Sequence, residues 1–289
     1  MVRIAPGVFL PGDVWRALDF DEQFRARVDA AALRFRNEGP FSHLSAAVMW
    51  GLPNVEPWPA RVEVLAGRDT GGRSRRWLAR HAVGIPVDGE SIDGHRVTSL
   101  ARTVVDAASA LSFAGGVAMA DFVMRPERRG EIGVAASRAS RVELLRAVAE
   151  RESPRGSAKA MRVVEFADGR AGSPGESLSR CAVRTAGLPA PELQTGFTDA
   201  AGLIGYVDFW WPDWGVIGEF DGRGKYLRED LRNGRSIAEV IVDEKVREDR
   251  LRAATGARMV RWGWDVARSP QLLAAALLRA GLPQRRRFS

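Results

Sequence analysis

The sequence predicts a mixed α+β protein with two domains, and three observations support this fold class. Apolar residues recur at helical spacing in some segments and alternate in short β-branched runs in others. Ser, Pro and Gly separate these segments where helix caps and turns are expected. A length of 289 residues with 45% hydrophobic residues suffices for two ordinary domains. We place the boundary at "RESPRGS", so that residues 1–150 form one domain and residues 151–289 the other.

The N-terminal domain is expected to combine helices with short strands. Ser42 is a candidate N-cap for one helix, which Gly51 and Pro53 end. The expected helices cover residues 13–37, 42–50, 99–124 and 138–150, and the expected strands are "RVEVLAG", "LARHAVGI" and "HRVTSL".

The C-terminal domain has a more distinctive order of elements. Its first helix has a Ser cap and a Pro near its start, and Gly256 ends its second helix. In chain order we expect a helix at 173–188, strands at 191–197, 202–211 and 215–222, a helix at 237–256, a strand at 257–264 and a helix at 269–282. The predicted order is therefore αβββαβα.

Composition excludes several classes of function. A single cysteine, Cys181, rules out an internal disulfide and a Cys-cluster zinc site. No histidine follows His95, which excludes histidine-dependent chemistry from the C-terminal two thirds of the chain. No apolar run approaches the ~18 to 20 residues of a membrane span. We therefore expect a cytoplasmic protein with no membrane partner. A net charge of +7 is compatible with a polyanionic partner.

Three carboxylates in an apolar, aromatic hairpin are the strongest functional signal. If the strands before and after "PDWG" pair symmetrically, partner residues have numbers that sum to 427, which places Asp208 opposite Glu219. Asp221 returns to the same face by the two-residue period of a strand if the strand extends that far. Such neighbouring carboxylates repel without a cation, and oxygen-only ligands favour Mg²⁺ or Mn²⁺. Asp221 precedes Gly222, so a plain turn remains the alternative for this residue.

At this point the C-terminal domain resembles a known superfamily. The αβββαβ order, Glu176 in "GES", Asp208 in "YVDF" and the "EFDG" segment resemble PD-(D/E)XK nucleases, most closely their very-short-patch-repair-like endonuclease domains. The resemblance covers about residues 171–282 and implies a restriction-endonuclease-like core. It also implies that Asp208 and Glu219 are metal ligands and that Glu176 is an accessory acid with a role in metal binding and catalysis.

The sequence departs from this superfamily at its catalytic lysine. Asp221 occupies the position where lysine is usual, so another cation must assist if the site is catalytic. Only three of the 43 basic residues are lysines. Two of them, Lys225 and Lys245, follow the acids within 26 residues of Glu219, and these two are the candidates. We favour Lys245, because its helix is expected to pack beside the sheet, whereas Lys225 lies in a loop.

The N-terminal part resembles a second family. "RIAPGVFLPGDVW", "SHLSAAVMWGLP" and "RVTSLARTVVDAA" resemble actinobacterial proteins related to AbiEi-type antitoxins of type IV toxin/antitoxin systems. The winged helix that precedes "GVFLP" in such proteins is incomplete here, so we carry no winged-helix DNA binding over. A scaffold or partner-binding role for this domain is the alternative.

These observations predict a metal-dependent endonuclease that hydrolyses phosphodiester bonds in nucleic acid, with DNA the expected substrate and RNA left open. The alternative is a catalytically inactive nuclease fold that acts as a DNA-binding or antitoxin-like regulator. The arginines expected to contact phosphates flank the acids, with the basic tail at 284–288 as an auxiliary: Arg223, Arg228, Arg232 and Arg235. The sequence leaves the oligomeric state open, with a homodimer as one alternative.

Overall fold

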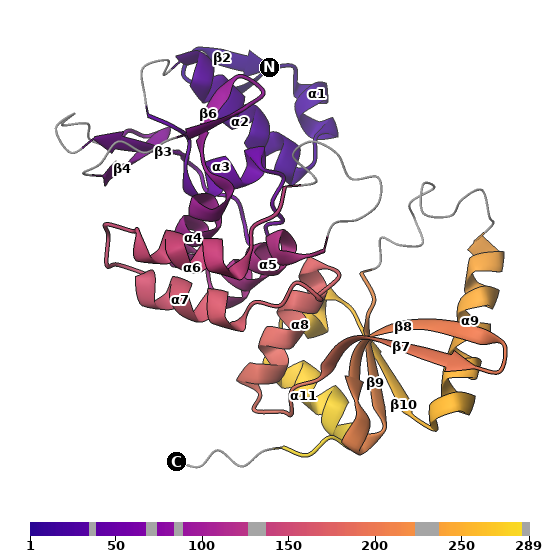
Figure 1. Cartoon of the computed structure of the whole chain (residues 1–289). Coiled ribbons are helices and arrows are strands. Elements are labelled where there is room, and N and C mark those ends of the chain that lie inside the picture. Colours follow the sequence, from indigo (N-terminus) through magenta and orange to yellow (C-terminus); the bar gives the residue numbers. More distant parts are fainter. Residues whose placement is uncertain (35–38, 68–73, 84–88, 127–136, 223–236, 285–289) are drawn as a thin grey trace. The chain divides into compact units, whose positions relative to one another are not determined.

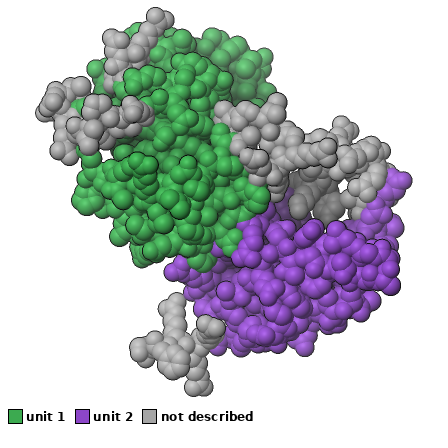
Figure 2. Space-filling model, viewed as in Figure 1, with its two compact units in different colours: residues 1–169 green, residues 170–289 purple. Residues whose placement is uncertain are grey.

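A computed structural model shows a mixed α+β protein made of two compact units, Met1–Gly169 and Arg170–Ser289 (Figures 1 and 2). The fold class predicted from the sequence is thus confirmed. The structure describes residues 1–34, 39–67, 74–83, 89–126, 137–222 and 237–284.

The boundary between the units lies further along the chain than the sequence predicted. Residues 151–169 were assigned to the second domain, but they belong to the first unit. They contain a helix, α7 (Ser157–Phe166), that the sequence analysis missed and that packs against α4, α5 and α6. "RESPRGS" is therefore a loop between two helices of one unit, because the apolar face of α7 needs the core of unit 1 to cover it.

Unit 1 contains small sheets and a set of helices. Its strands are β1 (Val2–Ala5), β2 (Val8–Leu10), β3 (Val62–Gly67), β4 (Leu78–Val83), β5 (Gly89–Ile92) and β6 (His95–Thr98). Its helices besides α7 are α1 (Gly12–Ala17), α2 (Phe20–Arg34), α3 (His43–Met49), α4 (Leu100–Ala110), α5 (Phe113–Met124) and α6 (Arg141–Ala149). The structure thus divides the expected helices 13–37 and 99–124 into two each. The second division follows a new cap, because the Ser112 side chain accepts a hydrogen bond from the Gly115 N–H.

The pairing of strands in unit 1 brings distant segments together. β3 and β4 are parallel, and β5 and β6 form an antiparallel pair. Phe41 joins the two pairs by bridging to Val64 and to Val97. As a result, α3, which begins two residues after Phe41, packs beside β3.

Unit 2 has the predicted order of elements, with one additional short helix. Its elements are α8 (Pro174–Thr185), β7 (Glu192–Asp199), β8 (Gly202–Trp211), a 3₁₀ turn (Pro212–Trp214), β9 (Val216–Phe220), α9 (Ile237–Thr255), β10 (Arg258–Trp262), α10 (Trp264–Ala267) and α11 (Pro270–Arg279). The sheet has the order β10-β9-β8-β7, in which only β9 and β10 are parallel. The two-residue alternation of apolar side chains was therefore a sound guide to the strands.

Helices cover both faces of this sheet (Figure 1). On one face, α8 packs against α10, α11 and β9, and the Trp262 indole donates a hydrogen bond to Ser179 Oγ at 2.8 Å. On the other face, α9 packs against β7 and β8, and Leu251 lies in a cluster with Ile204 and Ile217. Helices thus pack on both faces of the sheet, and this packing supports the side chains that project from its strands.

None of the helices in the described part of the chain is both long and apolar enough to cross a membrane.

Candidate functional site

The turn before α8 positions Glu176. Ser173 is the N-cap, and Pro174 occupies the first helical position, as the sequence predicted. Gly175 allows close packing on the sheet, because a Cβ there would lie 2.0 Å from the Phe220 ring. The Glu176 side chain is consequently buried, with 5% of the residue exposed, and accepts hydrogen bonds from Gly172 N at 2.7 Å and Ser173 Oγ at 2.9 Å.

Gln194 on β7 connects Glu176 to the acids of the hairpin. Its Nε2 donates to Glu176 Oε2 at 2.9 Å and to Asp208 Oδ1 at 3.1 Å. Its backbone has φ +51°, a left-handed conformation that is uncommon for a non-glycine residue inside a strand. Such strain persists only where the surroundings enforce it, and it is concentrated at functional sites. The sequence analysis missed Gln194, although it stands opposite Asp208 in the β7/β8 register.

The hairpin has the register that the sequence predicted. Phe209 pairs with Gly218 and Trp211 with Val216, and both pairs sum to 427. Beyond these pairs, Asp208 Oδ2 accepts a hydrogen bond from Phe220 N at 2.9 Å, which ties the side chain of β8 to the backbone of β9. The orientation of Asp208 is therefore set at both oxygens.

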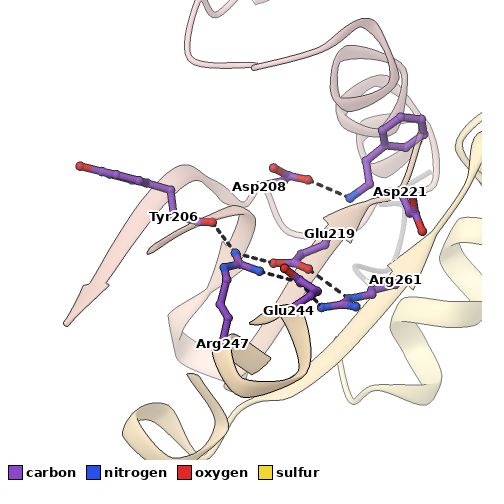
Figure 3. A pocket seen from close by; sticks show the side chains of 8 residues that line it. Tyr206, Asp208, Glu219, Asp221, Glu244, Arg247 and Arg261 are labelled. Atoms are coloured by element: carbon purple, nitrogen blue, oxygen red, sulfur yellow. Dashed lines mark hydrogen bonds and ion pairs between the residues drawn. The ribbon is translucent and has the colours of Figure 1, made fainter. Parts of the chain in front are cut away.

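The three acids of the hairpin line one cavity of about 200 Å³. Figure 3 shows the side chains around it, which come from β8, β9 and the residue that follows it, β10 and α9. The lining residues are Tyr206, Asp208, Glu219, Phe220, Asp221, Glu244, Arg247 and Arg261. Asp221 lines this cavity together with Asp208 and Glu219, but it lies just beyond β9, which ends at Phe220, so the strand period does not set its orientation.

Two arginines, however, balance these acids in a way the sequence did not indicate. Arg247 on α9 donates to Glu219 Oε1 at 2.8 Å, to Glu244 Oε1 at 2.9 Å and to the Tyr206 carbonyl at 2.6 Å. Burial alone would lower the pKa of Arg247, but the ion pairs with Glu219 and Glu244 outweigh it and raise the pKa above its usual value. Gly205 makes room for this side chain, because it has φ +147° and a Cβ there would lie 3.0 Å from Arg247 Nε.

Arg261 completes the arrangement from the neighbouring strand. It stands beside Glu219 in the parallel β9/β10 register and donates to Glu219 Oε2 at 3.1 Å and to Glu244 Oε1 at 2.6 Å. The counter-charge that the sequence analysis expected a metal ion to supply to Glu219 is therefore already present in the protein. Glu219 is neutralised by two guanidinium groups, and Asp208 is held by a backbone N–H and an amide.

The cavity nevertheless keeps an excess of negative charge. Its lining includes four carboxylates and two guanidinium groups, so the formal charge is −4 + 2 = −2. An oxygen-only donor set of this charge fits a hard divalent cation. The carboxylate oxygens are not gathered around one point, since among the described residues only a different cluster brings three such ligand atoms within 4.8 Å of one another.

The predicted lysines and phosphate-binding arginines have different outcomes. Lys245 is exposed on α9 and is not part of the cavity lining. The 3.6-residue helical period explains this, because Glu244, Arg247 and Leu251 face the sheet and Lys245 therefore points away. Lys225 and the tail at 285–289 lie outside the described residues, as do the predicted phosphate contacts Arg223, Arg228, Arg232 and Arg235.

Glu244, Arg247 and Arg261 are site residues that the sequence analysis did not single out. Two signals could have pointed to them. The i, i+3 spacing of Glu244 and Arg247 places both on one helix face, and Arg261 is a charged residue inside the otherwise apolar "MVRW" of an expected strand.

The cluster with three convergent ligand atoms lies in unit 1 and consists of His43, Glu63 and His81. The rings of the two histidines stack with their centroids 3.8 Å apart, and His81 Nε2 is 3.2 Å from Glu63 Oε1. Burial, followed by the effect of His81, lowers the pKa of His43 to about 3. The sequence analysis noted that no histidine follows His95 but did not connect His43 with His81. Parallel pairing of β3 and β4 brings Glu63 and His81 together, and the start of α3 adds His43.

No model of a known protein family matches the chain, and no solved structure matches it significantly. The chain is similar to the uncharacterized proteins MT2308 and Rv2248 of two Mycobacterium tuberculosis strains, CDC 1551 / Oshkosh and H37Rv. Each is 33% identical over 181 residues. The match covers 58% of this chain and 63% of each relative, so the chain spans less than two thirds of their length.

Proposed function

We propose that unit 2 is a divalent-metal-dependent nuclease that hydrolyses phosphodiester bonds, with DNA as the substrate and Mg²⁺ or Mn²⁺ as the cofactor. The observation that carries this proposal is the cavity beside the C-terminal end of β9, where Asp208, Glu219 and Asp221 contribute to a formal charge of −2. A phosphate cannot approach such a charge unless a cation is present. The resemblance of the αβββαβ order and of the acidic motifs to PD-(D/E)XK nucleases supports the same function.

Asp208, Glu219 and Asp221 would hold the cation, and Glu176 would keep Asp208 in place through Gln194. When bound, Mg²⁺ supplies positive charge that polarises a phosphate and lowers the pKa of a coordinated water. The other contributions come from the chain itself. The two hydrogen bonds to Asp208 fix its carboxylate before substrate arrives, which is the pre-organisation that electrostatic catalysis requires.

Arg247 and Arg261 are the cations that we assign in place of the usual lysine. Both have fork-shaped groups that can bind phosphate oxygens bidentately, and both line the cavity. With Glu219 engaged by a cation, the guanidinium groups of Arg247 and Arg261 would lose a carboxylate partner and could bind the negative charge of the transition state. Lys245 has no part in this scheme, whereas Lys225 stays a candidate that the described residues do not address.

The second candidate function is a non-catalytic nuclease fold that binds DNA or acts as an antitoxin-like regulator. A specific observation favours it: Glu219 is already paired with two arginines, and Asp221 stands where the superfamily has lysine. In that case the ion pairs would serve a structural purpose. Both candidate functions involve DNA, so turnover, and not binding, distinguishes them.

The test is incubation of the full chain with single-stranded, duplex and mismatched DNA, and with single-stranded RNA, in Mg²⁺, Mn²⁺ or EDTA. We expect DNA cleavage with either metal and none in EDTA. Asp208→Asn and Glu219→Gln should each lower the rate by at least about 10²-fold. Asp213→Asn is the matched control, because it makes the same change at an exposed turn of the same hairpin.

Three results would each lead to a different conclusion. Cleavage that persists in EDTA or in Asp208→Asn would reject the metal site. DNA binding that weakens with salt but shows no turnover in any metal would establish the regulator instead. Cleavage of RNA alone would retain the mechanism and change the substrate.

A further inference from the structure

Unit 1 contains a polar cluster that the proposed nuclease does not use. His43 is the first residue of α3, Glu63 is in β3 and His81 is in β4. Two nitrogen donors and one carboxylate are ligands that borderline metals such as Zn²⁺ prefer, whereas Mg²⁺ favours oxygen alone. The donor set therefore differs in class from that of the cavity in unit 2.

The sheet register explains how the three side chains meet. Glu63 pairs with Ala79 and Leu65 pairs with His81 in the parallel β3/β4 ladder, so Glu63 and His81 are diagonal neighbours on one face. The start of α3 lies over that face, since the Leu44 N–H donates to Glu63 Oε2 at 3.0 Å and the Glu63 N–H donates to Ser45 Oγ at 2.8 Å. Each ligand thus comes from a different, fixed element.

The hydrogen bonds of Glu63 and His43 leave one atom of each side chain that could bind a metal ion. Glu63 Oε2 is engaged by Leu44 N, so Oε1 is the carboxylate oxygen that faces His81. His43 Nδ1 is 3.1 Å from Ser42 Oγ, so Nε2 is its remaining nitrogen. A partner on the second ring nitrogen is the arrangement that orients metal-binding histidines in proteins.

Two properties of His43 lower the stability of the folded protein when no ligand is bound. It is buried and has φ +50°, in the left-handed region. Serine at position 42 also occupies the N-cap position of α3 without making a side-chain cap hydrogen bond, so its hydroxyl serves His43 instead.

We propose that His43, Glu63 and His81 form a binding site for one divalent transition metal of the Zn²⁺ class. The ligand atoms lie within 4.8 Å of one another. Tetrahedral Zn²⁺ with bonds of about 2.0–2.1 Å requires ligand atoms about 3.4 Å apart, so the side chains must close by up to about 1.4 Å. His81 is the residue able to move, since 36% of its side chain is exposed. Three protein ligands leave the fourth position open.

Such a metal would tie the strand β4 to the core. β4 pairs in the ladder with β3, and His81 is its link to α3. Metal binding at three elements stabilises whatever arrangement they share, because the ion binds the folded state. We therefore expect Zn²⁺ to slow hydrogen exchange in residues 78–83.

The test is isothermal titration of the full, EDTA-treated and dialysed chain with Zn²⁺ in the presence of excess Mg²⁺, which occupies oxygen-only sites. We expect one Zn²⁺ per chain. His81→Asn and Glu63→Gln should abolish this binding, and Ser42→Ala should weaken it by about 10- to 100-fold, as loss of a supporting hydrogen bond does. His95→Asn is the matched control in the same unit, because His95 pairs with Asp29 outside the cluster.

Co²⁺ gives a second measurement that does not depend on variants. The chain has three histidines, so its imidazole proton spectrum contains few signals. We expect paramagnetic Co²⁺ to broaden the signals of His43 and His81 first. Zn²⁺ binding that is unchanged in both His81→Asn and Glu63→Gln would overturn the proposal, as would absence of binding to the wild type. Co²⁺ broadening that starts at His95 would overturn it too.

Discussion

Substitution of Arg247 by Met tests whether the ion pairs at the cavity hold the acids in place until a cation arrives. Met keeps the apolar stem of the side chain and removes its charge. Glu219 and Glu244 would then share Arg261 alone, and the formal charge of the cavity lining would change from −2 to −3. The change thus removes one cation without opening a large hole.

The loss of stability follows from the contacts. Arg247 makes two charge-assisted hydrogen bonds and one to a carbonyl, and only 24% of its side chain is exposed. Hydrogen bonds to charged groups contribute about 1.5–3 kcal/mol each when buried, and partial exposure together with the remaining Arg261 reduces the sum. We expect Arg247→Met to lower the free energy of unfolding of unit 2 by about 2–3 kcal/mol without metal.

Divalent cations should then compensate for part of this loss. The more negative cavity of the variant attracts Mg²⁺ more strongly than the wild-type cavity does. A ligand that binds only the folded state at ten times its Kd contributes about 1.4 kcal/mol. We therefore expect Mg²⁺ to stabilise Arg247→Met more than it stabilises the wild type.

The assay is a urea titration read by pulsed hydrogen exchange and mass spectrometry, because peptides from β8 and β9 report on unit 2 separately from unit 1. Arg252→Met is the matched control on the same helix. Arg252 is half exposed and pairs with Glu248 at the surface, so its loss should cost less than about 0.5 kcal/mol. Equal stability of the two variants, or equal Mg²⁺ effects on Arg247→Met and the wild type, would refute the reasoning.

Three further predictions concern other parts of the molecule. Gly175→Ala should destabilise unit 2 by about 1–3 kcal/mol and reduce cleavage, because the new methyl group meets the Phe220 ring at 2.0 Å. Lys245→Ala should leave cleavage within about twofold of the wild type, whereas Arg261→Met should lower it by about 10²- to 10³-fold. In EDTA, lowering the pH from 7 to 5 should destabilise unit 1 by about 2 kcal/mol more in the wild type than in His43→Asn.

The sign of the pH effect comes from the pKa of His43, which is about 3 in the folded state against 6.5 in the unfolded state. Below pH 6.5 the unfolded chain takes up a proton that the folded chain refuses, so stability falls as the pH falls towards 3. Asn suits the left-handed backbone at this position. Identical pH dependence of the two proteins would contradict the prediction. A Gly175→Ala variant as stable as the wild type would contradict the prediction for that residue. A loss of cleavage well beyond about twofold in Lys245→Ala would contradict the prediction for the lysine.

Much of unit 2 could be predicted because its determinants are local. The αβββαβα order follows from apolar periodicity and from caps such as Ser173. The hairpin register follows from the short "PDWG" turn, and the two-residue period of a strand then places Asp208 and Glu219 together. The missed helix α7 and the misplaced domain boundary show the limit of this reasoning, because the sequence of a helix does not state which core covers its apolar face.

By itself, then, the sequence determined the elements of unit 2, the register of its central hairpin and the position at which Asp208 and Glu219 lie opposite each other, since each depends on residues close together in the chain. Only the tertiary structure decided which cations meet them. Arg261 is 42 residues from Glu219 in the sequence and reaches it because β9 and β10 pair in parallel. Arg247 is 28 residues from Glu219 in the sequence and reaches it from α9. The same holds for His43 and His81, which the parallel β3/β4 ladder and the position of α3 bring into contact. Such contacts depend on how whole elements bury their apolar faces, and local periodicity carries no information about that choice.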